Sequence, residues 1–227
     1  MKICLQWCAI PLALGIGSPL GAQVAKEVNE RYQTPEGRQQ VAANLGAPDR
    51  DERQKPGELV KSMGVKPGMT VADVGTGIGY MLPFLSRAVS ATGQVIAEDI
   101  FDDFLAAARM DAANKQLANI SFVKGTEQDP GLPEGAVDEV LVLDAYHHFD
   151  YPQPMLAGIH KALKADGKLV IVEYHKNAAS MPNNNGLIHI RLDKADVIKE
   201  VEANHFKLAS ERETIKDSQY MLIFDKD

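Results

Sequence analysis

Cysteine is almost absent from this sequence. The chain of 227 residues has two, Cys4 and Cys8, and both lie in its first eight residues. If the start of the chain is removed on export, the mature protein has no thiol. That excludes disulfides, a thiolate nucleophile and cysteine metal ligands from the mature chain.

Positive charge is also scarce. The 24 Lys and Arg residues stand against 31 Asp and Glu residues, a formal net charge of −7 at pH 7, and no basic cluster is present. Nucleic acid and anionic membrane surfaces attract proteins mainly through such clusters, so neither is expected as a partner. The expected partner is a small molecule, and the sequence does not indicate an oligomeric state.

The sequence has one long apolar run, from Ile3 to Gly17, which follows Lys2 and precedes small residues ending at Ala22. This pattern predicts a signal peptide over residues 1–22, with the alternative of an N-terminal helix packed on the core. The run is too short to span a bilayer comfortably, so stable membrane insertion of the mature chain is not expected. We expect an exported protein (periplasmic or extracellular) if the signal is cleaved, and a cytoplasmic one otherwise. Cleavage leaves 23 cations against 31 anions, a net charge of −8.

The rest of the chain has the composition of an ordinary globular protein, with 45% hydrophobic and 24% charged residues. Residues 23–58 are polar and interrupted by prolines, which predicts about two short helices forming an arm or cap, or alternatively a linker. Residues 59–227 are expected to form the main domain.

Short β-type runs alternate with helical ones after residue 59, which predicts parallel strands with helices on both faces of the sheet. The predicted strands are Met69–Val74, Gln94–Asp99, Asn119–Lys124, Val137–Asp144 and Lys168–Tyr174. The predicted helices between them cover residues 80–90, 102–117 and 155–164.

The C-terminal part differs, because a helix with Asp193 as N-cap is followed by two consecutive strands, residues 205–213 and 218–224. Two strands joined without a helix must be antiparallel. The predicted fold is therefore α/β: a doubly wound, mostly parallel seven-stranded sheet with a C-terminal antiparallel hairpin.

The stretch VADVGTGIGY, Val71 to Tyr80, places Gly75, Gly77 and Gly79 directly after the first predicted strand. Glycine permits positive φ and lets ligand atoms approach the main chain. In doubly wound folds ligands bind at the carboxyl ends of the strands, where this turn lies. The loop therefore predicts a nucleotide-type cradle.

Two residues of the loop disfavour a dinucleotide. Tyr80 stands where the dinucleotide fingerprint needs a small residue, and Asp73 is a carboxylate where a pyrophosphate would bind. A carboxylate suits a cationic ligand, and S-adenosylmethionine carries an ammonium and a sulfonium group but no phosphate. Asp99, at the end of the second strand, provides an acid for the ribose, with Glu98 as the alternative if the strand register differs by one.

The pattern D-x-G-x-G-x-G after the first strand, with an acid ending the second, resembles the class I S-adenosylmethionine-dependent methyltransferases. The resemblance implies that Asp73, Gly75, Gly77 and Gly79 surround the methionine end of the cofactor and that Asp99 binds the ribose hydroxyls. It also places Thr76, Tyr80 and Asp144 among the residues that contact the cofactor, S-adenosyl-L-methionine.

The segment Lys124–Asp144 is similar to the ubiquinone/menaquinone-biosynthesis branch of that superfamily. Many members of this branch place Asp after the glycine, where it contacts the adenine, whereas this chain has Thr126. The adenine contact is therefore open among Thr126, Glu127 and Asp129.

The motif DAYHHFDYP, Asp144 to Pro152, follows the fourth predicted strand, which in this superfamily ends beside the transferred methyl group. His147 and His148 are the candidate catalytic residues, as a base or as groups that orient the acceptor, with helix capping as the alternative role. His189 and Arg191, in the polar loop that follows residue 175, are further candidates to reach the acceptor. No metal site is expected, because only His175 or His189 could join the adjacent pair.

These features predict an S-adenosylmethionine-dependent methyltransferase that acts on a small-molecule acceptor by in-line displacement. The alternatives are an NAD(P)-dependent oxidoreductase, which Asp73 and Tyr80 oppose, and a non-catalytic protein that retains the cofactor-binding fold.

Overall fold

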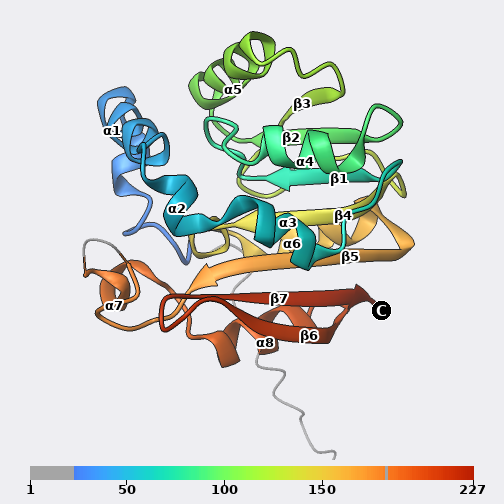
Figure 1. Ribbon diagram of the computed structural model, residues 1–227. Helices are drawn as coiled ribbons and strands as arrows, with labels where there is room; N and C mark the ends of the chain where they lie inside the picture. The colour runs from blue at the N-terminus through green and yellow to red at the C-terminus, as the bar shows by residue number, and fades with distance from the viewer. Residues whose placement is uncertain (1–22, 182–183) are drawn as a thin grey trace, which may run out of the picture.

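The computed structural model describes residues 23–181 and 184–227, so the predicted signal segment, residues 1–22, lies outside the described residues. A single seven-stranded sheet has the order β3-β2-β1-β4-β5-β7-β6 (Figure 1). β1 to β5 are parallel, and β7 runs antiparallel to both β5 and β6. This is the predicted fold, with the C-terminal hairpin on one edge of the sheet.

The strands are buried on both faces in the middle of the sheet, which explains their continuous apolar runs. Their bounds are Thr70–Val74 (β1), Gln94–Asp99 (β2), Ile120–Lys124 (β3), Val137–Leu143 (β4), Leu163–Tyr174 (β5), Phe206–Ile215 (β6) and Gln219–Lys226 (β7).

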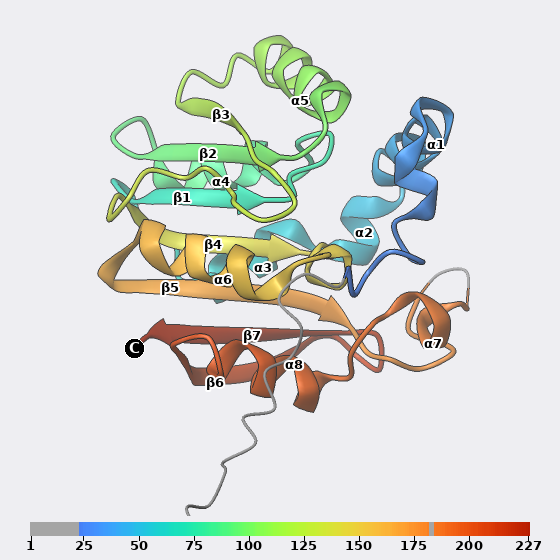
Figure 2. The same cartoon turned by 180° about the vertical axis from the view of Figure 1, so that it is seen from behind.

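The helices form two layers around this sheet. Apolar residues of α3 and α4 pack on one face, and those of α6 and α8 pack on the other (Figures 1 and 2). The helices are α1 (Pro35–Leu45), α2 (Arg50–Gln54), α3 (Pro56–Met63), α4 (Leu82–Val89), α5 (Asp102–Asn114), α6 (Pro152–Ala162), α7 (Gly186–His189) and α8 (Lys194–Glu202), with short 3₁₀ helices η1 (Glu30–Gln33) and η2 (Tyr146–His148). None of the helices in the described part of the chain has the length and apolarity needed to cross a bilayer.

Apart from shifts of a few residues at the ends of elements, the structure differs from the predicted elements in three places. β5 begins at Leu163, five residues before its predicted start, because Leu163 pairs with Val137 across a bulge. α3 crosses the predicted domain boundary at Glu58, since its apolar side packs on the main core. The loop after His175 contains the short helix α7, which the polar sequence did not indicate.

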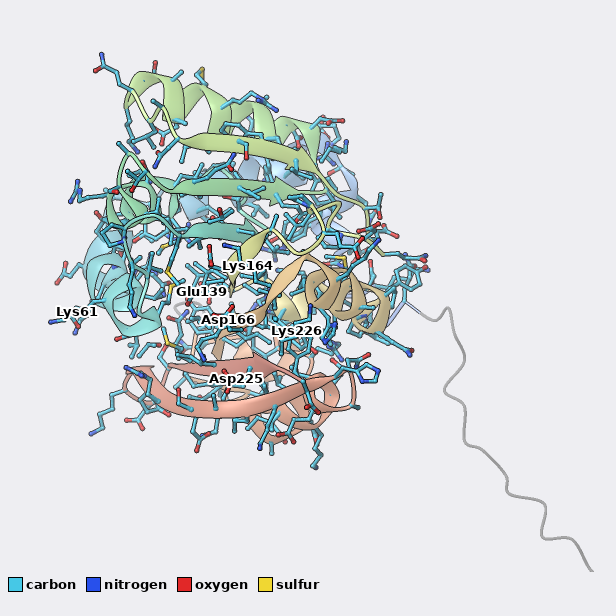
Figure 3. The ribbon with its side chains drawn as sticks, turned by 90° about the vertical axis from the view of Figure 1, so that its right-hand side faces the viewer. Lys61, Glu139, Lys164, Asp166, Asp225 and Lys226 are labelled. Carbon is cyan, nitrogen blue, oxygen red and sulfur yellow. The ribbon has the colours of Figure 1, made fainter. Side chains whose placement is uncertain are left out.

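Figure 3 views the sheet from the side at which the parallel strands begin, that is, onto their amino ends. Glu139 lies near the amino end of β4 with 2% of its surface exposed, and its Oε1 has no hydrogen-bond partner among the described residues. Burial raises the pKa of Glu139 to about 8, although Lys168 opposes the shift. The candidate site lies on the opposite side of the molecule, at the carboxyl ends of the parallel strands.

Candidate functional site

A pocket opens at the carboxyl ends of β1, β2 and β4, with about 1050 Å³ of empty space including the part open to solvent. Residues of η1, α1 and α2, which precede the sheet in sequence, form one wall of the pocket. The predicted site residues that line it are Asp73, Gly75, Thr76, Gly77, Tyr80, Asp99, Thr126, Glu127, Asp144 and His148.

The glycine loop turns sharply out of β1. Gly75, Gly77 and Gly79 have φ of 74°, 56° and 85°, a region that side chains with a Cβ seldom adopt. A Cβ at Gly75 would lie 2.8 Å from the Cβ of Ala145, so the loop needs glycine there for space as well. Gly79 does not line the pocket, because it packs against Leu82 and Ala108.

Asp73 stabilises the glycine loop through a hydrogen bond with Thr76. Its Oδ2 accepts a hydrogen bond of 2.7 Å from the hydroxyl of Thr76, and the carboxylate is buried. A side-chain bond of this kind fixes the carboxylate while leaving further lone pairs for a ligand. Tyr80 ends the same loop, and the guanidinium of Arg50 lies over its ring, 3.8 Å from the ring centre.

Both acidic residues at the end of β2 reach the glycine loop. Asp99 accepts hydrogen bonds from the backbone N–H of Gly77 (2.9 Å) and of Phe101 (2.9 Å). Glu98 accepts one from the N–H of Gly75 at 3.2 Å, and its Oε1 has no hydrogen-bond partner in the described part of the chain. The two alternatives that the sequence left open therefore both line the pocket.

The pocket concentrates acidic groups that burial makes hard to ionise. Burial raises the pKa of Asp73 and of Asp99 to about 6 each, and that of Asp144 to about 7. It raises the pKa of Glu98 well above the usual range, and the nearby Asp99 adds to that shift. A cation in the pocket would stabilise the ionised forms of these groups.

Asp144 follows β4 with a positive φ of 52° and connects the pocket to the N-terminal helices. It accepts a hydrogen bond of 2.6 Å from Gln219, whose own oxygen accepts one of 2.9 Å from Gln54 of α2. This chain of bonds ties α2, β7 and the pocket together.

The segment after β3 forms a tight turn at the rim of the pocket. The hydroxyl of Thr126 accepts hydrogen bonds from the N–H groups of Gln128 (3.2 Å) and Asp129 (3.0 Å). Thr126 and Glu127 line the pocket, whereas Asp129 bonds the N–H of Gly131 and does not. Of the three adenine candidates, Thr126 and Glu127 are therefore positioned at the pocket.

The two adjacent histidines of η2 point to different surroundings. His148 lines the pocket, whereas His147 is buried behind it and bonds Glu173 through Nδ1 at 2.8 Å. Burial lowers the pKa of His148 well below its usual value. Burial also acts to lower the pKa of His147, but Glu173 outweighs this effect and raises it.

Of the remaining histidine and arginine candidates from the sequence, only His189 lies close to the histidine pair of η2. His189 lies against both histidines of η2, with ring centres 4.8 Å from His147 and 5.3 Å from His148. Arg191 instead pairs with Glu200, at 2.5 Å, and does not line the pocket. His175 bonds Glu213 and lies apart from the cluster.

Two residues of the N-terminal segment complete the site and were not identified from the sequence. The Tyr32 hydroxyl lies 3.2 Å from Nε2 of His148, and Asn29 Oδ1 lies 2.7 Å from its Nδ1. These contacts join positions more than a hundred residues apart, in a segment without a motif. Only the polar composition of residues 23–58 hinted at a cap.

The comparisons with known proteins agree with this geometry. A family model described as "Methyltransferase domain" matches residues 72–171, from β1 to β5. The ubiquinone/menaquinone biosynthesis C-methyltransferase UbiE of Shewanella pealeana is 29% identical over 118 residues, which are 52% of this chain and 47% of the relative. The UbiE protein of Marinomonas sp. is also 29% identical over 118 residues. The chain thus spans about half the length of the curated relatives it matches.

Solved structures extend the similarity over most of the chain. A SAM-dependent methyltransferase from Aquifex aeolicus has a TM-score of 0.76 and 25% identity, and the match covers 83% of this chain and 98% of that one. The [4+2]-cyclase SpnF, at 15% identity and a TM-score of 0.63 over 76% and 80% of the two chains, shares the fold. The motif, the strand order and these matches together identify residues 72–171, from β1 to β5, as a domain of the class I S-adenosylmethionine-dependent methyltransferase family.

Proposed function

We propose that this protein transfers the methyl group of S-adenosylmethionine to a small-molecule acceptor held between the glycine loop and the N-terminal helices. The observation that carries the proposal is the composition of one pocket. It combines the Asp73 loop and Asp99 on one side with His148 and Tyr32 on the other.

The residues of the pocket fit the cofactor. Asp73 is buried and Asp144 is half-buried, and both carboxylates complement an ammonium and a sulfonium group, so no phosphate would be favoured beside them. Asp99 uses one lone pair on each oxygen for backbone N–H groups, so further lone pairs remain for two ribose hydroxyls. Thr126 and Glu127 at the rim are the candidates to contact the adenine.

The bound cofactor supplies a methyl group on a cationic sulfur that is already a good leaving group. The protein therefore has to hold the acceptor in line with that methyl group and exclude water. Phe149 and Met155 provide apolar surface at the pocket, and residues of η1 and α1 close its outer side. His148, with its Nδ1 bonded to Asn29, is positioned to orient a polar group of the acceptor.

The aromatic lining of the pocket favours a small aromatic acceptor. The ring of Tyr32 stacks on Phe101 with centres 5.9 Å apart and meets Phe104 edge-on at 6.2 Å, and all three rings line the pocket. Flat aromatic walls bind planar rings well. The curated relatives are named as C-methyltransferases of quinone biosynthesis, which supports an aromatic ring as acceptor.

The experiment is incubation of the protein with S-adenosylmethionine labelled on the methyl group and with extracts of small aromatic metabolites. Mass spectrometry should detect a labelled product, which the Asp99→Asn variant should form much more slowly when the cofactor is supplied below its saturating concentration. Because a [4+2]-cyclase shares the fold, product detection is needed as well as binding. Binding of the demethylated cofactor without any labelled product would favour a non-catalytic binding protein.

We also propose that residues 1–22 are a signal peptide and that the mature enzyme is exported, because an apolar run follows Lys2 and ends in small residues. N-terminal sequencing of the protein purified from a periplasmic fraction should begin at Gln23. Recovery of an intact Met1 from exported material would contradict this proposal.

A further inference from the structure

Three imidazoles meet at the border of the pocket. The nitrogen atoms that His147, His148 and His189 offer all lie within 4.8 Å of one another. The two histidines of η2 follow β4, and His189 ends α7 in the connection that follows β5. β4 and β5 are neighbours in the sheet, so the fold brings their carboxyl-terminal connections together. Histidine is the commonest metal ligand among the side chains.

The hydrogen bonds of His147 leave one nitrogen free for a ligand. Its Nδ1 contacts both oxygens of Glu173, at 2.8 and 3.0 Å, and a carboxylate can only accept, so Nδ1 carries the proton. The lone pair is then on Nε2, which is buried and has no hydrogen-bond partner among the described residues. A carboxylate behind a histidine is the usual outer partner of a metal ligand.

The tautomer of His148 is fixed in a similar way, by the side-chain amide of Asn29. Asn29 donates from Nδ2 to the carbonyl of His148 (2.9 Å) and to Asp150 (3.1 Å), which fixes its Oδ1 toward Nδ1 of His148. Nδ1 must therefore donate, and Nε2 carries the lone pair. That lone pair now meets the Tyr32 hydroxyl at 3.2 Å, a hydrogen bond that a metal ion would replace.

The distances require a small contraction. Three nitrogens around a tetrahedral Zn²⁺ at 2.0–2.1 Å lie about 3.3 Å apart, compared with the upper limit of 4.8 Å here. His189 can supply this movement, since it is half-buried and ends a four-residue helix. His147 and His148 are held in place by Glu173 and Asn29.

We propose that His147, His148 and His189 form a binding site for a divalent transition-metal ion, with Zn²⁺ as the metal that fits best. Three neutral imidazoles suit zinc, copper, iron or nickel rather than Mg²⁺ or Ca²⁺, which prefer oxygen ligands. Three protein ligands leave a fourth position for an outside ligand. His148 lines the pocket, so an oxygen, nitrogen or sulfur atom of a bound small molecule can take that position. The proposal departs from the sequence-based expectation of no metal, in which His189 and His175 were the two residues that could join the adjacent pair.

The test is calorimetric titration of the chelator-treated mature protein with Zn²⁺. One equivalent should bind, and His189→Gln should weaken binding by at least about 100-fold, with a loss of roughly 10- to 100-fold for Glu173→Gln. The matched control is His175→Gln, because His175 lies outside the cluster and bonds Glu213 instead. Its affinity should stay within about twofold of wild type. X-ray absorption of the zinc-loaded protein should show imidazole nitrogens at about 2.0–2.1 Å.

Two outcomes would overturn the proposal: no stoichiometric Zn²⁺ binding by folded wild-type protein, or binding that His189→Gln and His148→Gln leave unchanged. Folding of each variant is checked by thermal unfolding, and His189 is the decisive position because it is the least buried of those in the cluster. S-adenosylhomocysteine binding is measured on the same samples. It reports on the proposed function independently, so failure of one proposal is distinguishable from failure of the other.

Discussion

The backbone N–H of Gly77 donates a hydrogen bond of 2.9 Å to the carboxylate of Asp99, across the carboxyl ends of β1 and β2. This bond joins the two parts of the cofactor motif, which lie 22 residues apart in sequence. The glycine loop and the acid of the second strand are therefore one unit before any ligand binds, and a change in one should disturb the other.

Asp99→Asn tests that unit. An amide has a single oxygen, so it cannot accept from the N–H groups of both Gly77 and Phe101, and one of them would face an NH₂ group. Loss of a charged acceptor costs about 1.5–3 kcal/mol, so S-adenosylhomocysteine should bind roughly 10- to 100-fold more weakly by calorimetry. The control is Asp111→Asn on the exposed side of α5, where the pair with Lys115 is remote from the pocket. Equal affinity for wild type and Asp99→Asn would contradict the role of Asp99.

Cofactor affinity should depend on pH. Asp73 and Asp99 have pKa values of about 6 and Asp144 one of about 7, all raised by burial, so these groups gain protons as pH falls toward 5. A cationic ligand favours the ionised forms, so binding should strengthen from pH 5 to pH 8 and level off above. Calorimetry at pH 6.5 in two buffers of different ionisation enthalpy should show proton release. A steeper dependence is expected for S-adenosylmethionine than for S-adenosylhomocysteine, which lacks the sulfonium charge. Proton uptake, or a flat profile, would count against this electrostatic account.

Gly75→Ala should be more destabilising than a comparable substitution elsewhere. Gly75 has φ of 74° and its added Cβ would lie 2.8 Å from Ala145, whereas Gly135 has φ of 60° with no atom within 4 Å of an added Cβ. The left-handed conformation costs about 1–2 kcal/mol at both sites, and overpacking adds roughly 1–3 kcal/mol at Gly75. Urea unfolding of the two variants should separate them by that difference. Similar midpoints would show that the contact with Ala145 relaxes freely.

Glu139 should make stability fall as pH rises. Its folded pKa of about 8 lies above the unfolded value of about 4.3, so the unfolded state releases its proton first. The free energy of unfolding should therefore decrease by about 1.4 kcal/mol per pH unit from near pH 5 to pH 8, and then stay level. Glu139→Gln should remove this slope, measured as the difference between variant and wild type at pH 6 and pH 9. Glu134→Gln is the control, since Glu134 is exposed and pairs with Lys161. A constant difference between wild type and Glu139→Gln would contradict the prediction.

Most of the fold could be predicted because the sequence patterns that indicate strands, helices and caps are local. The runs that became β1, β2 and β4 are apolar and short, and Asp193 caps α8 as predicted, with its side chain accepting from the N–H of Asp196 at 3.0 Å. The early start of β5 was missed, because residues 163–167 are a mixed stretch that is recruited by pairing with β4. α7 was missed because four residues carry no periodic pattern.

The cofactor side of the site was also accessible from sequence, since a strand, a glycine turn and an acid lie at fixed spacing. The acceptor side was not, because its contacts are long-range. The bond between Tyr32 and His148 and the pairing of His147 with Glu173 depend on how the N-terminal helices and β5 pack, which no local pattern encodes. For the same reason His189 could not be distinguished from His175 as the neighbour of the histidine pair.

The most direct measurement is calorimetry of the purified protein with S-adenosylmethionine, S-adenosylhomocysteine and NAD. The account predicts one site per chain for the two sulfur compounds and no detectable binding of NAD, because buried acids surround the glycine loop and Tyr80 ends it. Tight binding of NAD, together with no binding of either sulfur compound, would contradict the account.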